Sequence, residues 1–462
     1  MALLAGCARY EPRPLAPAAV ADSLDRRSLS DPALKSFLEK NLKRELTEWP
    51  AKTWDFEALS LAAFYYNPSL DVARADWHVA QSGERTAGGR PNPTVSVTPA
   101  YNNEIPGNYS PWMPGVTFDV PIETAGKRKK RIEQAERLSE SARFKIAVAA
   151  WQVRADLRTS LLEYTAARQR AKVLSAQLQF QREIVSLLEK RQQVGAVART
   201  ELTLPRLALT RAGADFADAN RLAVEARSHI AAAIGVPASA IANVEFEFPL
   251  PVSEANARQL TSSEARKQAL LGRADILSAL ADYAASESAL RLEIAKQYPD
   301  VHLNPGYSWN SGNAGDNQWQ LGFTVELPVF NRNEGPIAEA EAKRAATGAR
   351  FLALQAKVIS DIDSAIAARV SAQDQLEKQS DLLKLAREQA ASVSTLFQAG
   401  AADKLELASA QLEASATELA SVDAQVRAQQ ADARLEDAVQ RPLPNWPKLE
   451  QGRVEQAKQQ HP

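Results

Sequence analysis

The chain has 462 residues, and its 55 lysines and arginines against 56 aspartates and glutamates give a net charge of -1. This length exceeds one ordinary hydrophobic core, so we expect two domains or a repeated unit. The balanced charge argues against a general surface for nucleic acid, and no run of about 18 apolar residues offers a transmembrane helix, which leaves strands as the route across a bilayer.

A candidate lipidation motif lies at the start of the chain. The run LAGC, which ends at Cys7, resembles the lipobox of a bacterial lipoprotein, in which the cysteine is lipidated and becomes the mature N-terminus. It predicts lipidation of Cys7, with most of the signal peptide upstream of Met1. The alternative is a chance LAGC in an alanine-rich protein. The proline-rich and polar composition that follows predicts a tether over residues 1–54.

Most of the remaining chain is a duplicated unit. The stretch "PTVSVTPAY" at 93–101 corresponds to "PDVHLNPGY" at 299–307, an offset of about 206 residues. Likewise "VGAVARTEL" at 194–202 corresponds to "AGAADKLEL" at 399–407. The expected domains are the lipobox and tether at 1–54, a first repeat at 55–262, a second repeat at 263–440 and a C-terminal tail at 441–462.

Each repeat contains two strand-like stretches in which apolar and polar residues alternate. The strands are expected at about 94–101, 112–121, 301–309 and 318–328. The apolar face is expected to hold Val95, Val97, Val116, Phe118, Val120, Val301, Leu303, Phe323, Val325 and Leu327. The polar face is expected to hold Ser96, Thr117, Asp119, His302, Asn304, Thr324 and Glu326. This alternation is typical of transmembrane β-strands, although a half-buried strand of a soluble sheet shows the same pattern.

Aromatic residues favour the membrane interpretation. They gather at the loop-side ends of the expected strands, where an interfacial girdle would lie. These residues are Tyr101, Tyr109, Trp112, Tyr307, Trp309 and Trp319. Four strands cannot close a barrel, and an open sheet edge in lipid leaves backbone groups unpaired. The pattern therefore predicts that several chains share one barrel, and three chains of four strands would give about twelve.

Two long helices are expected at about 127–193 and 337–398. The first stretch contains neither proline nor glycine, and it would be about 100 Å long at a rise of about 1.5 Å per residue. Each is expected to pair as a coiled coil with the following antiparallel helix, at about 200–234 and 402–438. The apolar stripe that includes Leu174, Leu178, Val185 and Leu188 is interpreted as packing.

These elements together resemble the TolC-like outer-membrane efflux channels. The resemblance rests on the repeat, on "PNPT", "VPIETAGKRKKRIEQAE" and "LPVFNRNEGPIAEAEA", and on the "VGA…TEL" and "AGA…LEL" turns, over about residues 55–440. The turn that contains GKR is most similar to the heavy-metal, CzcC-like and related lipoprotein branches. The first turn reads "ETAGKR" where a second glycine is common in that branch.

The resemblance implies a mainly α-helical fold with a small β part. Three chains would form a homotrimer, with a twelve-stranded transmembrane β-barrel continued into a long α-helical periplasmic tunnel. It implies a lipid-anchored outer-membrane channel of a tripartite efflux system, which meets a periplasmic membrane-fusion adaptor directly and an inner-membrane pump of RND type indirectly. The runner-up function is a periplasmic coiled-coil adaptor or scaffold lipoprotein, which would carry a lipoyl-like β-domain between its helices.

Candidate site residues come from both ends of the repeat. By resemblance, the periplasmic aperture and adaptor contact would include Gly195, Glu201, Phe397, Gly400 and Glu406. An arginine is common five residues after that aromatic, and Ala402 stands there instead, so a gate latch would need other partners such as Arg199 or Lys404. Asp119 and Glu326 are related by the repeat and would form a ring of six acids in a trimer, unless they are only wetted wall residues.

No reaction chemistry is expected. The four histidines, His78, His229, His302 and His461, share no metal-ligand spacing, and only His302 lies where it could touch cargo. No phosphate-binding glycine loop, Ser-His-Asp set or HExxH motif occurs. We expect no catalytic residue, no cofactor, no metal site and no nucleic-acid partner.

Overall fold

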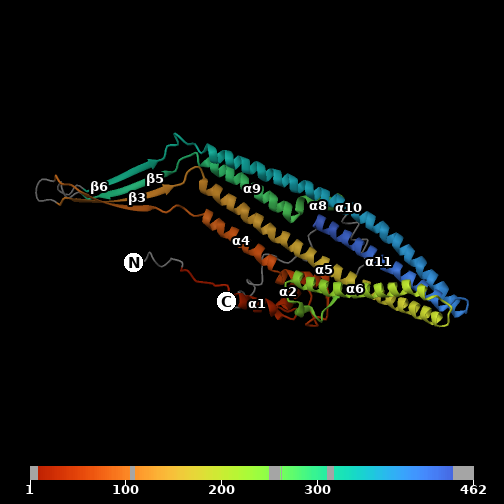
Figure 1. The fold of residues 1–462 in the computed structure, drawn as a ribbon. Coiled ribbons are helices and arrows are strands. Elements are labelled where there is room, and N and C mark those ends of the chain that lie inside the picture. The colour runs from red at the N-terminus through yellow and green to blue at the C-terminus, as the bar shows by residue number, and fades with distance from the viewer. Residues whose placement is uncertain (1–8, 105–109, 249–260, 262, 310–316, 441–462) are drawn as a thin grey trace. The chain divides into compact units, whose positions relative to one another are not determined.

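The structure, a computed structural model, describes residues 9–104, 110–248, 261, 263–309 and 317–440 (Figure 1). Cys7, Tyr109, His461 and the predicted tail lie outside these residues. The chain forms two compact units. The first contains Met1–Asp71, Ala149–Ala269 and Asp361–Pro462, and the second contains Val72–Val148 and Leu270–Ser360. Each unit thus combines segments of both sequence repeats.

Two long helices contribute to both units. They are α5 (Lys127–Gln193) and α10 (Glu334–Gln398). The first unit also contains α1 (Pro17–Asp25), α2 (Pro32–Leu42), β1 (Thr53–Asp55), α3 (Phe56–Tyr66), η1 (Arg199–Leu202), α6 (Thr203–Ile234), η2 (Ala238–Ile241), β4 (Glu245–Glu247), most of α8 (Ser263–Gly272) and α11 (Lys404–Val439). The second unit contains most of α4 (Pro68–Ala87), and all of β2 (Thr94–Tyr101), β3 (Trp112–Ile122), α9 (Ala274–Ala295), β5 (Val301–Ser308) and β6 (Gln318–Val325).

The four predicted strands form one antiparallel sheet in the second unit. The strand order is β2-β3-β5-β6, so β2 and β6 are its edges. Val95 pairs with Phe118 across the first hairpin, and Leu303 pairs with Phe323 across the second. The register therefore places the predicted apolar residues within the strands on one face. Strand β6 ends at Val325, earlier than expected, and the missing N–H of Pro328 prevents pairing at that position.

The N-terminal segment differs from the predicted tether. Residues 9–16 are extended, but α1 and α2 follow, and Leu34 and Leu38 of α2 are almost fully buried. Arg27 donates hydrogen bonds to the carbonyl oxygens of Tyr66 and Gly235 at 2.7 and 2.8 Å. Composition alone missed this packing because the proline-rich stretch at 10–17 is typical of a tether, whereas the buried residues of α2, Leu34, Phe37 and Leu38, share one face of the helix.

The long helices agree with the prediction. α5 begins and ends where expected, and α6 follows after the short η1 turn. In the first unit, Leu174 and Leu178 of α5 are each 7% exposed, and Leu174 packs with Ala219 of α6. Ion pairs join α5 to α11 as well, including Arg170 to Asp423 at 2.7 Å. The apolar stripe is thus a helix–helix contact, as predicted, although Leu188 is only half-buried.

Candidate functional site: a two-faced sheet, its joints and two helical tips

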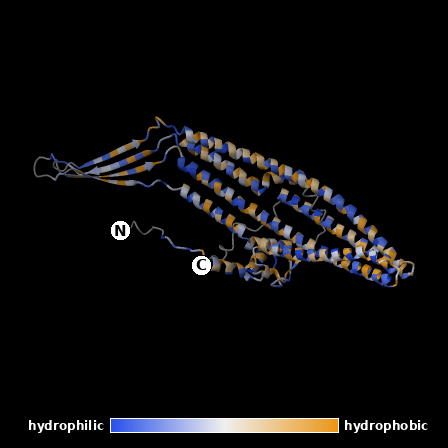
Figure 2. Cartoon of the chain, in the orientation of Figure 1, coloured by the Kyte–Doolittle hydropathy of each residue, from blue (hydrophilic) through white to orange (hydrophobic). Residues whose placement is uncertain are grey.

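The sheet of the second unit has one face that carries only aliphatic and aromatic side chains. Paired residues share a face, so alternate positions starting from Val95, Trp112, Val301 and Trp319 all point the same way. Many of these side chains are exposed, among them Val97 at 67%, Leu321 at 61% and Phe323 at 68%. Figure 2 shows hydrophobic and hydrophilic residues alternating along the strands. A surface of this kind is unfavourable in water and is suited to lipid or to another protein.

Aromatic rings lie at the loop-side end of this sheet. The Tyr101 and Trp112 ring centroids are 5.1 Å apart, and Tyr307 lies 4.6 Å from both Trp309 and Trp319. Trp319 is 83% exposed. The described part of the predicted aromatic cluster is therefore assembled at one end of the four strands, as the sequence indicated.

The opposite face carries a hydrogen-bonded polar group. Nδ1 of His302 lies 2.9 and 3.1 Å from the two carboxylate oxygens of Asp119, and the Asn304 amide donates to the same carboxylate at 3.2 Å. The Thr324 hydroxyl donates to Asn304 Oδ1 at 2.9 Å. Residues from β3, β5 and β6 are joined in this way, and Asp119 and His302 remain 36% and 39% exposed.

Glu326 has a different environment from Asp119, although the two are equivalent in the repeat. Glu326 follows the end of β6, is exposed, and lines a shallow polar pocket of about 240 Å³ together with Lys127, Lys296 and His302. Sequence reasoning paired the two acids through the repeat and did not foresee that only Asp119 has a histidine partner. The partner lies 183 residues away in sequence, so only the strand register reveals it.

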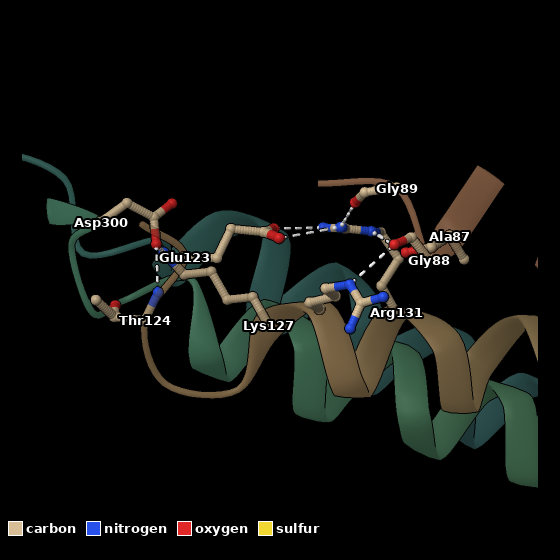
Figure 3. A network of polar contacts seen from close by, with 9 residues as sticks. Ala87, Gly88, Gly89, Glu123, Thr124, Lys127, Arg131 and Asp300 are labelled. Atoms are coloured by element: carbon tan, nitrogen blue, oxygen red, sulfur yellow. Dashed lines mark hydrogen bonds and ion pairs between the residues drawn. The ribbon is translucent and has the colours of Figure 1, made fainter. Parts of the chain in front are cut away.

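The first strand–helix joint is held by several charged side chains (Figure 3). The Arg131 guanidinium contacts both carboxylate oxygens of Glu123, at 2.7 and 3.2 Å. It also donates to the carbonyl oxygens of Ala87 and Gly89 at 2.9 and 3.0 Å, while Arg128 donates to Gly88 at 2.8 Å. These bonds satisfy carbonyl groups where α4 ends, and cations suit a helix C-terminus.

A second part of this joint attaches the start of β5. Asp300 accepts from Lys127 Nζ and from the Thr124 backbone N–H, each at 2.8 Å. Burial opposes ionisation of Asp300, but the hydrogen bonds from Lys127 and Thr124 outweigh it and hold the pKa of Asp300 below its usual value. The Lys127 side chain is only 10% exposed.

The second joint, at the start of α10, is built with fewer charges. Asn333 Nδ2 donates to the Glu293 backbone oxygen at 2.8 Å and to its carboxylate at 3.1 Å. Asn333 has φ +62°, and its equivalent in the first repeat, Gly126, has φ +69°. Both turns therefore use a left-handed residue at the same position, which glycine and asparagine tolerate best.

The two helical tips have the same backbone geometry. Gly195 and Gly400 have φ +77° and +74°. In each turn, the N–H after the glycine bonds to the carbonyl five residues back, from Ala196 to Arg191 at 2.9 Å and from Ala401 to Leu396 at 2.8 Å. These are Schellman caps, which need a left-handed residue and so explain the repeated "GA".

Of the two predicted acids, Glu201 caps the helix that follows its turn, whereas Glu406 is itself capped by Asp403. Glu201 accepts from the Ala198 N–H at 3.2 Å, whereas Glu406 donates its backbone N–H to Asp403 Oδ1 at 2.8 Å. Phe397 is 37% exposed and lies one turn before Gly400. The first unit therefore contains both predicted turns, and in each turn one carboxylate, that of Glu201 or Asp403, accepts a capping hydrogen bond.

Ion pairs that the sequence did not identify connect the elements around the tips. Arg191 contacts Asp403 at 2.7 Å and Lys404 contacts Glu183 at 2.6 Å, so α11 is tied twice to α5. The hydrogen bond from Arg191 lowers the pKa of Asp403. Lys404 was predicted as a possible latch residue, and it does pair with an acid. Arg199, the other possibility, forms no ion pair within the described residues.

A buried charge cluster near the end of α11 was also missed. Arg154 contacts Glu436 at 2.7 Å, and Arg158 pairs with both Glu436 and Asp437. Both arginines are less than 10% exposed, and the Arg154 guanidinium lies 4.6 Å from the Phe56 ring centroid. Burial raises the pKa of Asp437, which Arg158 partly offsets. The four-residue spacing of the arginines on α5 was the available signal.

Two further searches concern only the described residues. No group of three or more histidine, cysteine, aspartate or glutamate side chains is arranged to hold a metal ion there. In the same part of the chain, no helix combines the length and apolar character that crossing a bilayer requires.

Comparison with known proteins agrees with this architecture. The family model described as outer membrane efflux protein matches residues 62–236 and 265–439, which correspond to the two repeats. The cobalt-zinc-cadmium resistance protein CzcC of Cupriavidus metallidurans is 25% identical over 283 residues, which cover 61% of this chain and 65% of CzcC. The match therefore spans slightly less than two thirds of that relative.

Solved structures share the fold at low identity. VceC, an outer membrane protein of Vibrio cholerae, has a TM-score of 0.67 at 21% identity, over 83% of this chain and 95% of VceC. A membrane protein from Pseudomonas aeruginosa gives 0.70 at 18%, over 85% and 92%. The CmeC outer membrane channel of Campylobacter jejuni gives 0.65 at 15%, over 90% and 89%.

The fold and its faces define a duplicated helical protein with one membrane-type β-hairpin in each repeat. The two family matches coincide with those repeats. The chain belongs to the outer membrane efflux protein family.

Proposed function

We propose that the protein is the outer-membrane duct of a tripartite efflux system, a passive channel without catalytic activity. The observation that carries this proposal is the four-stranded sheet with an exposed apolar face and a polar face that contains Asp119 and His302. Lipid favours the first face and a water-filled lumen favours the second. The family membership supports the same function.

We further propose a homotrimer in which three sheets close one twelve-stranded barrel. Strands β2 and β6 are edges, and unpaired edges in lipid cost several kcal/mol per backbone group, so a partner strand is needed. The helices support lateral association. In the second unit α4 exposes Val72 and Val79, whereas in the first unit α6 exposes Leu204 and Leu207 and α10 exposes Leu382 and other large apolar residues. Within the described residues, α11 exposes none.

The two tips are the proposed contact with a periplasmic membrane-fusion adaptor, through which an inner-membrane pump of RND type would deliver substrates. The tips present small residues after Gly195 and Gly400, together with Phe397 and exposed Leu396. Apolar and small side chains at a helical turn suit contact with another helical hairpin. Cross-linkers attached at Ala196 and Ala401 should capture the adaptor.

Lipid anchoring through Cys7 remains part of the proposal. Two or three acyl chains would anchor firmly, since each buried CH₂ contributes about 0.8 kcal/mol. A chain expressed with its complete upstream signal should incorporate labelled fatty acid, and Cys7→Ser should not. The sheet also anchors the protein, so we expect Cys7→Ser to retain at least partial export. A wild-type chain that takes up no label would refute lipidation.

The cargo is open to direct test. The relative CzcC is a cobalt-zinc-cadmium resistance protein, so these divalent cations are the first substrates to examine. The chain has one cysteine and two methionines, which argues against a relay of soft ligands inside the duct. Strains with the gene intact and with the gene disrupted should be compared for their sensitivity to metal ions and to organic drugs.

Planar-bilayer recording tests the duct. If Glu201 and Glu406 line the entrance, three chains place six carboxylates there, and Glu201→Gln with Glu406→Gln should lower cation selectivity at low salt. The effect should shrink at 1 M salt, where the Debye length is about 3 Å. The control is Asp119→Asn with Glu326→Gln in the wider sheet, which should change selectivity less. Protein that inserts but never conducts would contradict the proposal.

The alternative function is a periplasmic coiled-coil adaptor or scaffold lipoprotein. The helical hairpins would suit either function, but an adaptor has no need for an exposed apolar sheet. Fractionation separates the two candidates, because the duct should be recovered from outer-membrane fractions as heat-sensitive trimers. Recovery with the inner membrane would favour the adaptor.

A further inference from the structure

The first strand–helix joint contains more positive charge than its structure uses. Five consecutive basic residues occupy 127–131, and Arg90 precedes β2 in the same joint. Lys127, Arg128 and Arg131 are engaged with Asp300, Glu123 and the end of α4. These three cations therefore explain how the joint is held, and they leave the others without a structural role.

Lys129, Lys130 and Arg90 are the remaining cations. The Lys129 side chain is 82% exposed, and the carboxylate of Glu133 on the next turn is 3.9 Å from its Nζ. Arg90 is exposed and Lys130 half-buried, and neither forms an ion pair within the described part of the chain. An exposed ion pair such as that of Lys129 with Glu133 contributes little to stability, so all three charges remain available to an external anion.

The position of these cations just beyond the ends of the strands indicates which kind of anion they meet. β3 has 11 residues, and at about 3.3 Å per residue it is about 36 Å long, or roughly 28 Å deep when tilted by about 40°. This matches a hydrocarbon core of about 30 Å. The aromatic rings of Tyr101 and Trp112 mark one boundary, so the joint after Ile122 lies at the other.

The second joint has a different chemistry at the same boundary. There the chain exposes Val329 at 66% and the Phe330 ring completely, while Phe330 corresponds in the repeat to the paired Glu123. Exposed aromatic residues are interfacial anchors, as basic residues are. The two joints therefore supply complementary contacts to one membrane surface.

We propose that Arg90, Lys129 and Lys130 bind phosphate groups of anionic phospholipids in the leaflet that faces the helices, while Phe330 enters the boundary between headgroups and acyl chains. This inference rests on the proposed insertion of the sheet in a membrane. Basic residues next to a membrane-spanning segment attract anionic headgroups at about 1 kcal/mol each. The bound lipids would fix the depth of the sheet.

The test uses full-length protein reconstituted in vesicles of mixed phosphatidylglycerol and phosphatidylcholine. After mild re-extraction, mass spectrometry measures the ratio of the two lipids that remain bound, relative to the bulk ratio. Wild-type protein should retain phosphatidylglycerol selectively. Lys129→Gln with Lys130→Gln should lower this selectivity about tenfold, as expected for the loss of two surface cations with some screening. Salt at 1 M should weaken it in the wild type.

Controls separate this site from general charge. Lys172→Gln with Lys190→Gln makes the same charge change in the part of α5 that belongs to the first unit, so selectivity should persist. Phe330→Ser should reduce retention of both lipids equally. Insertion without selectivity, or unchanged selectivity in the Lys129 and Lys130 variant, would overturn the headgroup site alone. Failure of the wild type to insert would overturn the duct as well.

Discussion

At the scale of single residues, the strand–helix turns show how the backbone determines sequence. Gly126 and Asn333 are equivalent in the repeat, and both have positive φ. In the first turn, Ala125 directly precedes Gly126 and is also left-handed, with φ +52°. This turn reads "ETAGKR", where a second glycine is common in the CzcC-like branch. The alanine adopts the same conformation at an energetic cost that glycine would avoid.

Replacing this alanine should therefore stabilise the protein. The left-handed conformation costs a non-glycine residue about 1–2 kcal/mol, whereas glycine adds about 0.4–1 kcal/mol of entropy to the unfolded chain. We expect Ala125→Gly to gain up to about 1 kcal/mol, measured as a higher midpoint of thermal unfolding in detergent. The control is Ala242→Gly, at a right-handed φ of -54°, which should lower the midpoint. A lower midpoint for both variants would refute strain at Ala125.

The tip residue Asp403 makes a pH-dependent prediction. Its pKa is lowered in the folded state, so its contribution to stability is present above the unfolded pKa and is lost as pH falls through the folded pKa. Asp403→Asn can retain the cap to Glu406 but loses the ion pair with Arg191. We expect wild type and variant to differ by less than about 1 kcal/mol at neutral pH, since the pair is exposed.

Acid unfolding experiments provide the check. The difference between wild type and Asp403→Asn should be constant from about pH 8 to pH 5 and should shrink below about pH 4, where the aspartate begins to bind protons. Asp403→Ala also removes the cap and should cost about 1 kcal/mol more at every pH. A difference that grows on acidification would have the wrong sign for a lowered pKa.

At the scale of elements, the joint between α5 and β5 depends on the ion pair of Lys127 with Asp300, whose side chains are 10% and 33% exposed. Lys127→Met leaves Asp300 without its cation, and Asp300→Asn leaves Lys127 charged at a site that is only 10% exposed. We expect each single variant to lose about 2 kcal/mol, somewhat less than a fully buried pair. The double variant should recover part of that loss. Limited proteolysis near residue 124 should detect the loosened joint.

The elements were largely predictable from sequence. Alternation, proline positions and the repeat located all four strands, because each apolar face must satisfy the same two-residue period. α5 was located by the absence of proline and glycine over its whole length. The packed N-terminal segment was not predicted, because its burial depends on Arg27 reaching carbonyl groups at Tyr66 and Gly235, far away in sequence.

The candidate site was predictable only where it repeats. Gly195 and Gly400 were identified from the repeat and the resemblance, and Asp119 because it lies on the polar face of a strand. The structure adds the reason for the glycines, since both turns need a left-handed residue. The partners His302 and Arg191 were not assigned, since cross-strand and interhelical register cannot be read from spacing along one chain. Two of the proposed lipid-binding cations, Lys129 and Lys130, were visible in the sequence as part of a basic run. Only the contacts of Asp300 and Glu123 show which cations of that run already have partners.

At the scale of the whole molecule, the proposed trimer predicts on which helices an added charge prevents assembly. Leu382 and Leu385 of α10 are 53% and 61% exposed in the single chain. If they are covered by a neighbouring chain, Leu382→Lys with Leu385→Lys should release monomers, because burial of two unpaired cations is costly. Sedimentation in detergent measures this. Ser409→Lys, at an exposed position of α11, should leave the trimer intact. Intact trimers in both variants would exclude this face of α10 from the interface.

The parallel pairing of β1 with β4 has a consequence for the order in which the chain folds. Thr53–Asp55 pairs with Glu245–Glu247, and nearby Asn67 donates to the Ala233 carbonyl oxygen at 2.8 Å. These contacts close the first repeat using residues no later than 247. The four-stranded sheet needs residues up to 325, and the pairing of α5 with α11 needs the last third of the chain. During synthesis from the N-terminus, the first repeat can therefore close before its exposed apolar hairpin has a partner, which makes that hairpin the segment in most need of chaperone protection.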